Sequence, residues 1–236
     1  MAGLKPMSSG FVRFNVAMAG LDMSGVDAAR KYLDAFRCST ELFATVQHFA
    51  RTYPNSKTNE MERPFEGVVF HRGALRRTVQ GHALFFHALG LSTHSSPMET
   101  LMAVEYIPDE RRNRGLGYLY GYPDYAVDFF VEASESQKQT GRFVEREFRS
   151  FPTFSRTREE RGVVYAVPKG QDERPEDREF AQAIEKILQN YRLRREIFIG
   201  PGKRGVIAML REWFCGDRGL CAAPEAVSSV PAQSQR

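Results

Sequence analysis

The fold is decided by one stretch, Gly162-Val163-Val164-Tyr165-Ala166-Val167-Pro168, which is the clearest β-strand in the sequence. It is a short run of β-branched and aromatic residues bounded by a glycine and a proline, as is typical of a buried strand. A long helix is predicted to start at Pro175, because proline favours the first helical position. Apolar residues recur along this helix at helical spacing: Phe180, Ile184, Ile187, Leu188 and Tyr191. Gly200-Pro201-Gly202 is expected to end it.

Upstream of this strand, the best local indication of a helix is Ser96-Pro97-Met98-Glu99. Serine at the N-cap, proline at the first helical position and glutamate three residues further on form a capping box. That helix is predicted to end before Pro108. Further helices are predicted from Ser24 as a cap, from Ser39 to Ala50, from Asp124 as a cap to a stop at Gly141, and from Lys203 to Phe214.

The remaining segments are predicted as strands or loops. Short apolar or alternating runs favour strands at Phe11–Met18, Val68–Phe70 and Phe143–Phe148. Polar or charged composition predicts loops at 55–66 and 108–114. Glycines and alternating tyrosines predict a tight extended segment at Gly115–Pro123. Periodicity does not decide between a helix and a pair of strands for Leu75–Leu91.

Together these elements predict an α+β fold in which five or six helices pack on a small mixed or antiparallel sheet. Strands and helices do not alternate strictly enough for a doubly wound sheet. A mostly helical bundle is the alternative, because several of the strands are short. The predicted organisation is a disordered N-terminus over 1–10, a single globular domain over 11–215 with a possible helical subdomain at 175–215, and a flexible tail over 216–236.

Composition predicts a soluble cytoplasmic protein. Of the 236 residues, 42% are hydrophobic and 26% are charged, which fits a globular chain and not a disordered one. No apolar run approaches the ~20 residues that span a bilayer, and no signal peptide is recognisable. The three cysteines, Cys38, Cys215 and Cys221, form no Cys-x-x-Cys motif, so reduced thiols are expected.

The net charge is +4, and the arginines gather in short groups that also contain or adjoin acidic residues. Mixed-sign charge is typical of a solvated surface, and a nucleic-acid footprint is usually more uniform in sign. Nucleic acid is therefore not an expected partner. The sequence leaves the oligomeric state open.

An anion site is predicted at Gly200-Pro201-Gly202-Lys203-Arg204-Gly205, just before an apolar helix. Free amides at a helix start attract anions, glycines allow close approach, and two cations add charge. The expected ligand-binding residues here are Gly202, Lys203, Arg204 and Gly205. Tyr120, Tyr122 and Asp124 are expected to line a pocket for the same ligand. The turn is not a P-loop, because the Gly-x-x-x-x-Gly-Lys-Ser/Thr spacing is missing.

No metal, cofactor or catalytic residue is assigned by the sequence. Four histidines fall close together, but their spacings do not place ligands on one helix face: His71, His82, His87 and His94. Three carboxylates are candidates for acid–base catalysis: Glu105, which lies in an apolar run, and Asp128 and Glu132, which stand four residues apart on a predicted helix. Whether the protein is an enzyme stays open.

The leading hypothesis is therefore a small-ligand protein, an enzyme or an accessory factor, that holds a phosphate or carboxylate group at the 200–205 turn. A pocket joining this turn to the 118–124 segment would favour it. The alternatives are a protein–protein interaction or regulatory module without catalysis, and a metal-dependent enzyme that uses the histidines between 71 and 94.

Overall fold

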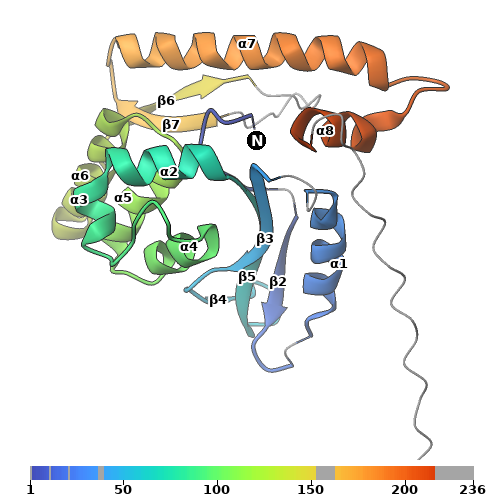
Figure 1. Cartoon of the computed structure of the whole chain (residues 1–236). Coiled ribbons are helices and arrows are strands. Elements are labelled where there is room, and N and C mark those ends of the chain that lie inside the picture. The colour runs from blue at the N-terminus through green and yellow to red at the C-terminus, as the bar shows by residue number, and fades with distance from the viewer. Residues whose placement is uncertain (1, 11, 21, 37–39, 153–162, 216–236) are drawn as a thin grey trace, which may run out of the picture.

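The computed structural model describes residues 2–10, 12–20, 22–36, 40–152 and 163–215. Its larger sheet is built around one long strand, β5 (Met61–His71). β1 (Met7–Ser8) and β2 (Arg13–Ala17) pair with one edge of β5, and β3 (Leu42–His48) and β4 (Tyr53–Pro54) pair with the other edge. Every pair in this sheet is antiparallel (Figure 1).

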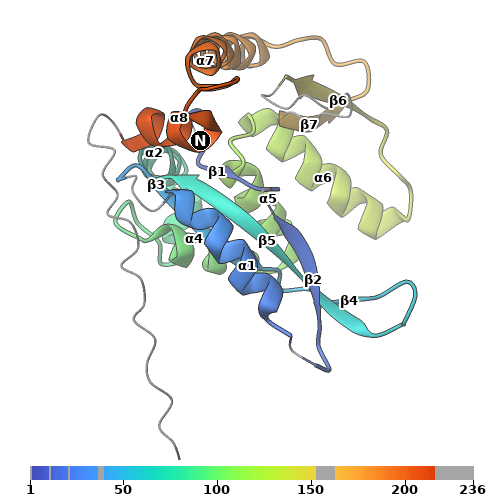
Figure 2. The ribbon, with the colours of Figure 1, turned by 90° about the vertical axis from the view of Figure 1, so that its right-hand side faces the viewer.

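Helices cover both faces of this sheet. α1 (Ser24–Leu33) and the short turn η1 (Asp34–Phe36) lie on the face that presents Val69. Four further helices lie over the face that presents Val68 and Phe70 (Figure 2). Their bounds are Arg72–Gly81 for α2, Ala83–His87 for α3, Pro97–Glu105 for α4 and Asp109–Leu119 for α5.

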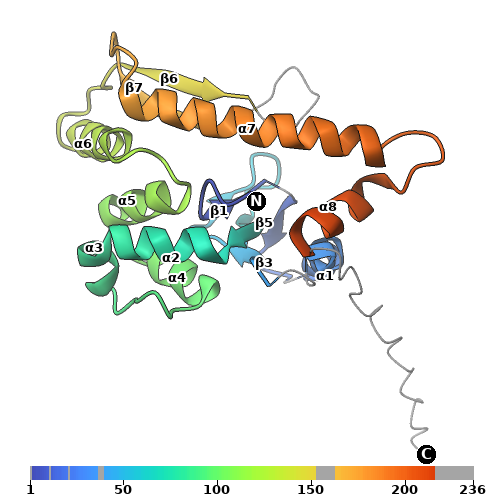
Figure 3. The ribbon, with the colours of Figure 1, turned by 45° about the horizontal axis from the view of Figure 1, so that its top comes forward.

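A second layer follows in the chain. α6 (Asp124–Thr140) leads into an antiparallel hairpin of β6 (Arg146–Phe151) and β7 (Val163–Pro168). α7 (Pro175–Phe198) lies across this hairpin, and α8 (Gly205–Cys215) returns to the α1 side of the sheet (Figures 1 and 3). Ile184 and Leu188 of α7 share an apolar cluster with Ala126 of α6 and Tyr165 of β7. The contacts of α7 therefore tie it to the hairpin and to α6.

The α+β prediction is confirmed, and the sheets are antiparallel. Both hydrogen bonds of the predicted capping box at Ser96 are present, and Pro97 occupies the first helical position. Gly141 ends α6 with a left-handed φ of 69°. β7 and the start of α7 at Pro175 match the predictions as well. In the segment 75–91, left open by the sequence, residues 75–81 belong to α2 and 83–87 form α3, and a turn follows.

The predicted helix over 39–50 is wrong, because most of this segment is β3. Leu42, Phe43 and Val46 fit a helical period, but the run is also rich in residues that favour strands. Seven residues of β3 pair with β5, and this pairing outweighs the local period. The predicted loop at 55–66 is wrong in its second half for the same reason, since β5 begins at Met61.

The predicted loop at 108–114 and extended segment at 115–123 are also wrong, because α5 runs through Asp109–Leu119. The glycines that suggested a break permit close helix packing instead. A Cβ atom at Gly115 would lie 2.7 Å from Cγ1 of Val104, and one at Gly117 would lie 2.8 Å from Cγ2 of Val127. α5 can approach α4 and α6 this closely only because these two positions lack side chains.

Three smaller predictions also differ from the structure. Met7 is fully buried and β1 pairs with β5, so the expectation of disorder over 1–10 is wrong for this strand. Ser24 and Asp124 each occupy the first turn of their helix; the N-caps are Met23 and Pro123, without a side-chain cap. The predicted tail over 216–236 lies outside the described residues, as do Cys38 and Cys221. The division into domains stays a prediction.

None of the helices in the described ranges is long and apolar enough to cross a membrane.

One buried carboxyl group connects the N-terminal segment to the sheet. Glu66 of β5 is only 7% exposed and lies between Arg13 of β2 and Gln47 of β3. Burial raises the pKa of Glu66, although Arg13, the Gly10 amide, Gln47 and Ser9 oppose this shift. A carboxyl group whose pKa is raised by folding stabilises the protein below its unfolded pKa, and this contribution is lost as the pH rises through the folded pKa.

We expect Glu66→Gln to raise the melting temperature at pH 7, because the variant removes a buried charge and keeps hydrogen-bonding capacity. The gain should shrink as the pH falls towards the ordinary value of 4.5, where wild-type Glu66 becomes neutral. Thermal unfolding between pH 4 and pH 8 measures both effects. Glu60→Gln, at an exposed position just before β5, is the matched control. A variant that is less stable than wild type at pH 7 would contradict the expectation.

Candidate functional site

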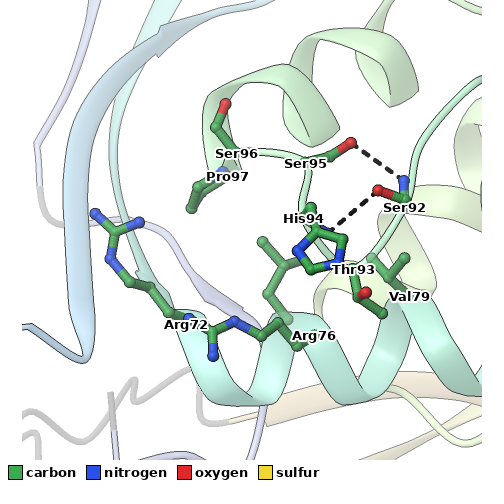
Figure 4. A pocket seen from close by; sticks show the side chains of 10 residues that line it. Arg72, Arg76, Val79, Ser92, Thr93, His94, Ser95, Ser96 and Pro97 are labelled. Atoms are coloured by element: carbon green, nitrogen blue, oxygen red, sulfur yellow. Dashed lines mark hydrogen bonds between the residues drawn. The ribbon is translucent and has the colours of Figure 1, made fainter.

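A cavity of about 350 Å³ lies between the first turns of α2 and the loop that leads into α4. Figure 4 shows two arginine side chains on the α2 side and a loop rich in hydroxyl groups on the other. The ten lining residues are Arg72, Leu75, Arg76, Val79, Ser92, Thr93, His94, Ser95, Ser96 and Pro97.

The α2 wall supplies two positive charges. Arg72 and Arg76 stand four residues apart, so both project from the same side of the helix. The Arg72 guanidinium lies 5.2 Å from the centre of the Phe43 ring on β3, a cation–π contact that uses none of its hydrogen-bond donors. Neither guanidinium forms an ion pair with any described residue, and no described Asp or Glu lines the cavity. The charges of both arginines are thus left for a ligand.

Over residues 92–95 the loop wall supplies three hydroxyl groups, and two of their oxygens already accept hydrogen bonds. Oγ of Ser95 accepts the Ser92 amide at 3.1 Å, and Oγ of Ser92 accepts the His94 amide at 3.2 Å. These bonds hold the loop in shape and leave the hydroxyl protons of both serines without an acceptor among the described residues. The Thr93 hydroxyl makes no hydrogen bond within the described residues. The loop wall therefore offers donors more readily than acceptors.

The base of the cavity is apolar and rigid. Leu75 is 4% exposed and Val79 is 1% exposed, and both belong to the main apolar cluster of the sheet. Pro97 is buried at the start of α4, where the capping box fixes the loop to the helix. In that box Oγ of Ser96 accepts the Glu99 amide at 3.1 Å, and Oε2 of Glu99 accepts the Ser96 amide at 3.2 Å. A ligand would find this site preformed.

This arrangement can bind an anion. Guanidinium groups and hydroxyl protons both donate to oxygen atoms, and the lining carries a formal charge of +2 if His94 is neutral. The starts of α2 and α4 also lie beside the cavity, and helix starts favour negative charge.

The 200–205 turn has a different environment. Nζ of Lys203 donates to the carbonyl oxygen of Glu196, at the end of α7. The Arg204 guanidinium lies 3.1 Å from Oε2 of Glu212 and 4.9 Å from the centre of the Phe198 ring. The two cations therefore point to separate intramolecular partners. Gly202 and Gly205 have φ values of 70° and 85° with open space around them, so backbone conformation explains these glycines.

Tyr120, Tyr122 and Asp124 fall on the short connection between α5 and α6 and on the first residue of α6. The rings of Tyr120 and Tyr122 stack with centres 5.8 Å apart, and the Tyr120 hydroxyl lies 3.2 Å from Ser9 Oγ. Burial raises the pKa of Tyr122 to about 12. Asp124 is 69% exposed, with its Oδ1 atom 3.5 Å from Nε2 of His82. Tyr122 and Asp124 line a cavity of about 440 Å³ that they share with Glu176 and Glu179, so its charge is unfavourable for an anion.

The structure therefore does not bring the two predicted groups of ligand-binding residues together. Tyr122 and Asp124 lie near the first turn of α7, whereas Lys203 and Arg204 follow its last turn (Figures 1 and 3). α7 has 24 residues, which corresponds to a length of roughly 36 Å. None of the cavities found among the described residues joins the two ends.

The histidines have individual surroundings. His71 caps α2 by accepting the Ala74 amide on Nδ1, and the His82 ring stacks on Tyr118 with centres 3.7 Å apart. His87 ends α3, and His94 lines the α2 cavity. Across the described residues, no group of three or more His, Cys, Asp or Glu side chains could hold a metal ion.

Two of the candidate acids are bound to arginines. The Glu105 carboxylate is fully buried and accepts Nη2 of Arg112 at 2.8 and 2.9 Å, with the Ala50 amide at 2.9 Å. Asp128 pairs with Arg114, while Glu132 is exposed on α6. These contacts connect helices and loops, which is a structural role.

Comparison of the chain with protein-family models, curated proteins and solved structures finds no match.

Proposed function

We propose that this protein binds a small anionic ligand, and that the anion is held in the cavity between α2 and the Ser92–Pro97 loop. The observation that carries the proposal is the pair Arg72 and Arg76, two guanidiniums that line one cavity without an ion-pair partner among the described residues. Guanidinium groups that face a shared cavity are well suited to carboxylate and phosphate oxygens.

The 200–205 turn is the competing location for the same activity. It has free backbone amides at the start of α8 and two nearby cations, which still fit an anion site. Its cations, however, are engaged with Glu196 and Glu212. Binding there would have to displace these contacts, whereas binding at Arg72 and Arg76 breaks no ion pair among the described residues.

The interaction-module alternative is supported by one surface. Leu193 and Ile197 stand four residues apart on α7 and are 64% and 69% exposed. Two large apolar side chains on one helix face are a candidate contact surface for another protein. This alternative becomes the leading one if no anion binds.

Isothermal titration of the full chain with inorganic phosphate, pyrophosphate, sulfate and citrate tests the proposal. We expect at least one of these anions to bind, and Arg72→Ala and Arg76→Ala each to weaken binding by about tenfold or more, because each removes charge-assisted hydrogen bonds worth about 1.5–3 kcal/mol. Melting temperatures should change little for Arg76→Ala, since Arg76 is exposed.

Two control variants locate the site. Arg77→Ala changes the next residue of α2, whose Nη2 atom donates to the Gly3 carbonyl at 3.0 Å and which does not line the cavity. Lys203→Ala with Arg204→Ala removes the cations of the competing turn. Both should bind like wild type. If only the Lys203 and Arg204 variant loses binding, the anion site is at the 200–205 turn, and if no anion binds at millimolar concentration, the proposed function is wrong.

A further inference from the structure

We infer that the ligand of the α2 cavity is a phosphomonoester carried on a short aliphatic group. This inference rests on the proposed function and narrows it to one class of anion. Three properties of the cavity lead to it: the number and kind of donors, the apolar base, and the residue types that the lining lacks.

The cavity offers more hydrogen-bond donors than the two oxygens of one carboxylate can accept. Arg72 and Arg76 present two separate guanidinium forks from one wall. Ser92, Thr93 and Ser95 add three hydroxyl protons from the facing loop, none of which has an acceptor among the described residues. A carboxylate has two oxygens and is matched by one guanidinium, whereas a phosphomonoester has three terminal oxygens that can accept from both walls.

The charge of the cavity fits the same ligand. Its lining carries two arginines and no described acidic residue, so its formal charge is +2 when His94 is neutral. A phosphomonoester carries a charge of about −1.5 to −2 at pH 7, which nearly balances it. A monocarboxylate would balance only one of the two positive charges.

The apolar base restricts what the phosphate is attached to. Leu75, Val79 and Pro97 offer aliphatic contact but no hydrogen bonds from their side chains. No described Phe, Tyr or Trp lines the cavity, and the exposed imidazole of His94 is the one aromatic ring in its described lining, so it offers a nucleobase little surface for stacking. A volume of about 350 Å³ is also at the small end of ligand sites. A short aliphatic carrier fits these conditions better than a nucleotide.

Two sources could present this group: a free metabolite, or a phosphorylated serine side chain of another protein. Calorimetry of the full chain with glycerol 3-phosphate, a phosphoserine hexapeptide, succinate and adenosine monophosphate separates the possibilities. We expect glycerol 3-phosphate to bind at least tenfold more tightly than succinate or the nucleotide. The peptide binding tighter than glycerol 3-phosphate would identify the protein-bound source and keep the phosphomonoester class.

Thr93→Val tests the loop wall without changing side-chain shape. Its hydroxyl is a free donor in the described residues, so its loss should weaken glycerol 3-phosphate binding severalfold and leave the melting temperature unchanged. Thr78→Val on α2, outside the lining, is the control and should bind like wild type. An unchanged affinity for Thr93→Val would contradict the inference, because a phosphomonoester held by both walls would lose a hydrogen bond.

The remaining outcomes distinguish the inference from the proposed function. Succinate binding as tightly as glycerol 3-phosphate, still dependent on Arg76, would overturn the phosphomonoester inference and leave anion binding in place. Adenosine monophosphate is itself a phosphomonoester, so equally tight binding of this nucleotide would overturn the short aliphatic carrier. Absence of binding for every probe here, and for the inorganic anions above, would overturn both.

Discussion

Replacing Asp177 with alanine is expected to destabilise the protein by about 3–5 kcal/mol, because this carboxylate is the shared acceptor of a buried network. Asp177 is fully buried in the first turn of α7. Its Oδ1 atom accepts the hydroxyls of Tyr125 and Tyr165 at 2.5 and 2.6 Å, and its Oδ2 atom accepts the Arg174 amide at 3.0 Å. Alanine would leave the buried Tyr165 hydroxyl, the half-buried Tyr125 hydroxyl and a helix start without their partner.

Graded variants separate the parts of this network. Tyr125→Phe and Tyr165→Phe each remove one donor and should cost about 1–1.5 kcal/mol, since the carboxylate keeps its other bonds. Urea unfolding measures all three, with Asp172→Ala in the exposed preceding loop as the control. A loss for Asp177→Ala no larger than that for Asp172→Ala would show that the network does not stabilise the fold.

The same network predicts sensitivity to acid. Burial alone would raise the pKa of Asp177, but the two tyrosine hydroxyls, the Arg174 amide and Arg149 together hold it below its ordinary value. A group whose pKa is lowered by folding contributes stability above its unfolded pKa, and that contribution is lost as the pH falls through the folded pKa. The destabilisation by Asp177→Ala should therefore be largest near neutral pH and smaller in acid.

Glu105→Ala is expected to cost a similar amount, about 3–5 kcal/mol, because it leaves Arg112 with an uncompensated charge. The Arg112 side chain is only 15% exposed, and its Nε atom has no hydrogen-bond partner among the described residues. Glu105 also accepts the Ala50 amide, so the variant loosens the loop after β3 as well as the contact of α4 with α5.

A double-mutant cycle isolates this ion pair. Arg112→Leu alone should also be strongly destabilising, because it leaves the buried Glu105 carboxylate unpaired. Combining it with Glu105→Met replaces both charges by apolar groups and should cost less than the single variants Arg112→Leu and Glu105→Met added together. Chemical denaturation of the four proteins gives the coupling energy. Strictly additive losses would contradict a direct interaction between the two side chains.

Local chemistry in the sequence predicted several elements correctly. The capping box at Ser96, the stop at Gly141 and the proline at the start of α7 act within a few residues, so they can be recognised without the rest of the fold. β3 and α5 could not be predicted in this way. β3 depends on pairing with β5, and the glycines of α5 are explained only by Val104 and Val127 on neighbouring helices.

The candidate site was less predictable than the fold. Arg72 and Arg76 stand four residues apart, which places both side chains on one face of a helix. That spacing is informative only once the segment is known to form α2. No prediction was made for the hydroxyl-rich loop that precedes the capping box. At the 200–205 turn, composition suggested converging cations, whereas the contacts with Glu196 and Glu212 that separate them depend on the packing of α7 and α8.

The position of α8 has a consequence for the order of folding. Phe214 of α8 packs against an apolar cluster made by Leu33, Phe36, Leu42 and Val69, all from the first third of the chain. During synthesis this cluster would emerge early, covered in part by α1, and would lack its contact with Phe214 until α8 had been made. Contacts between such distant parts of a sequence slow folding and prolong the exposure of apolar surface. The nascent chain would therefore be most prone to association through the α1 side of the sheet, before α8 reaches it.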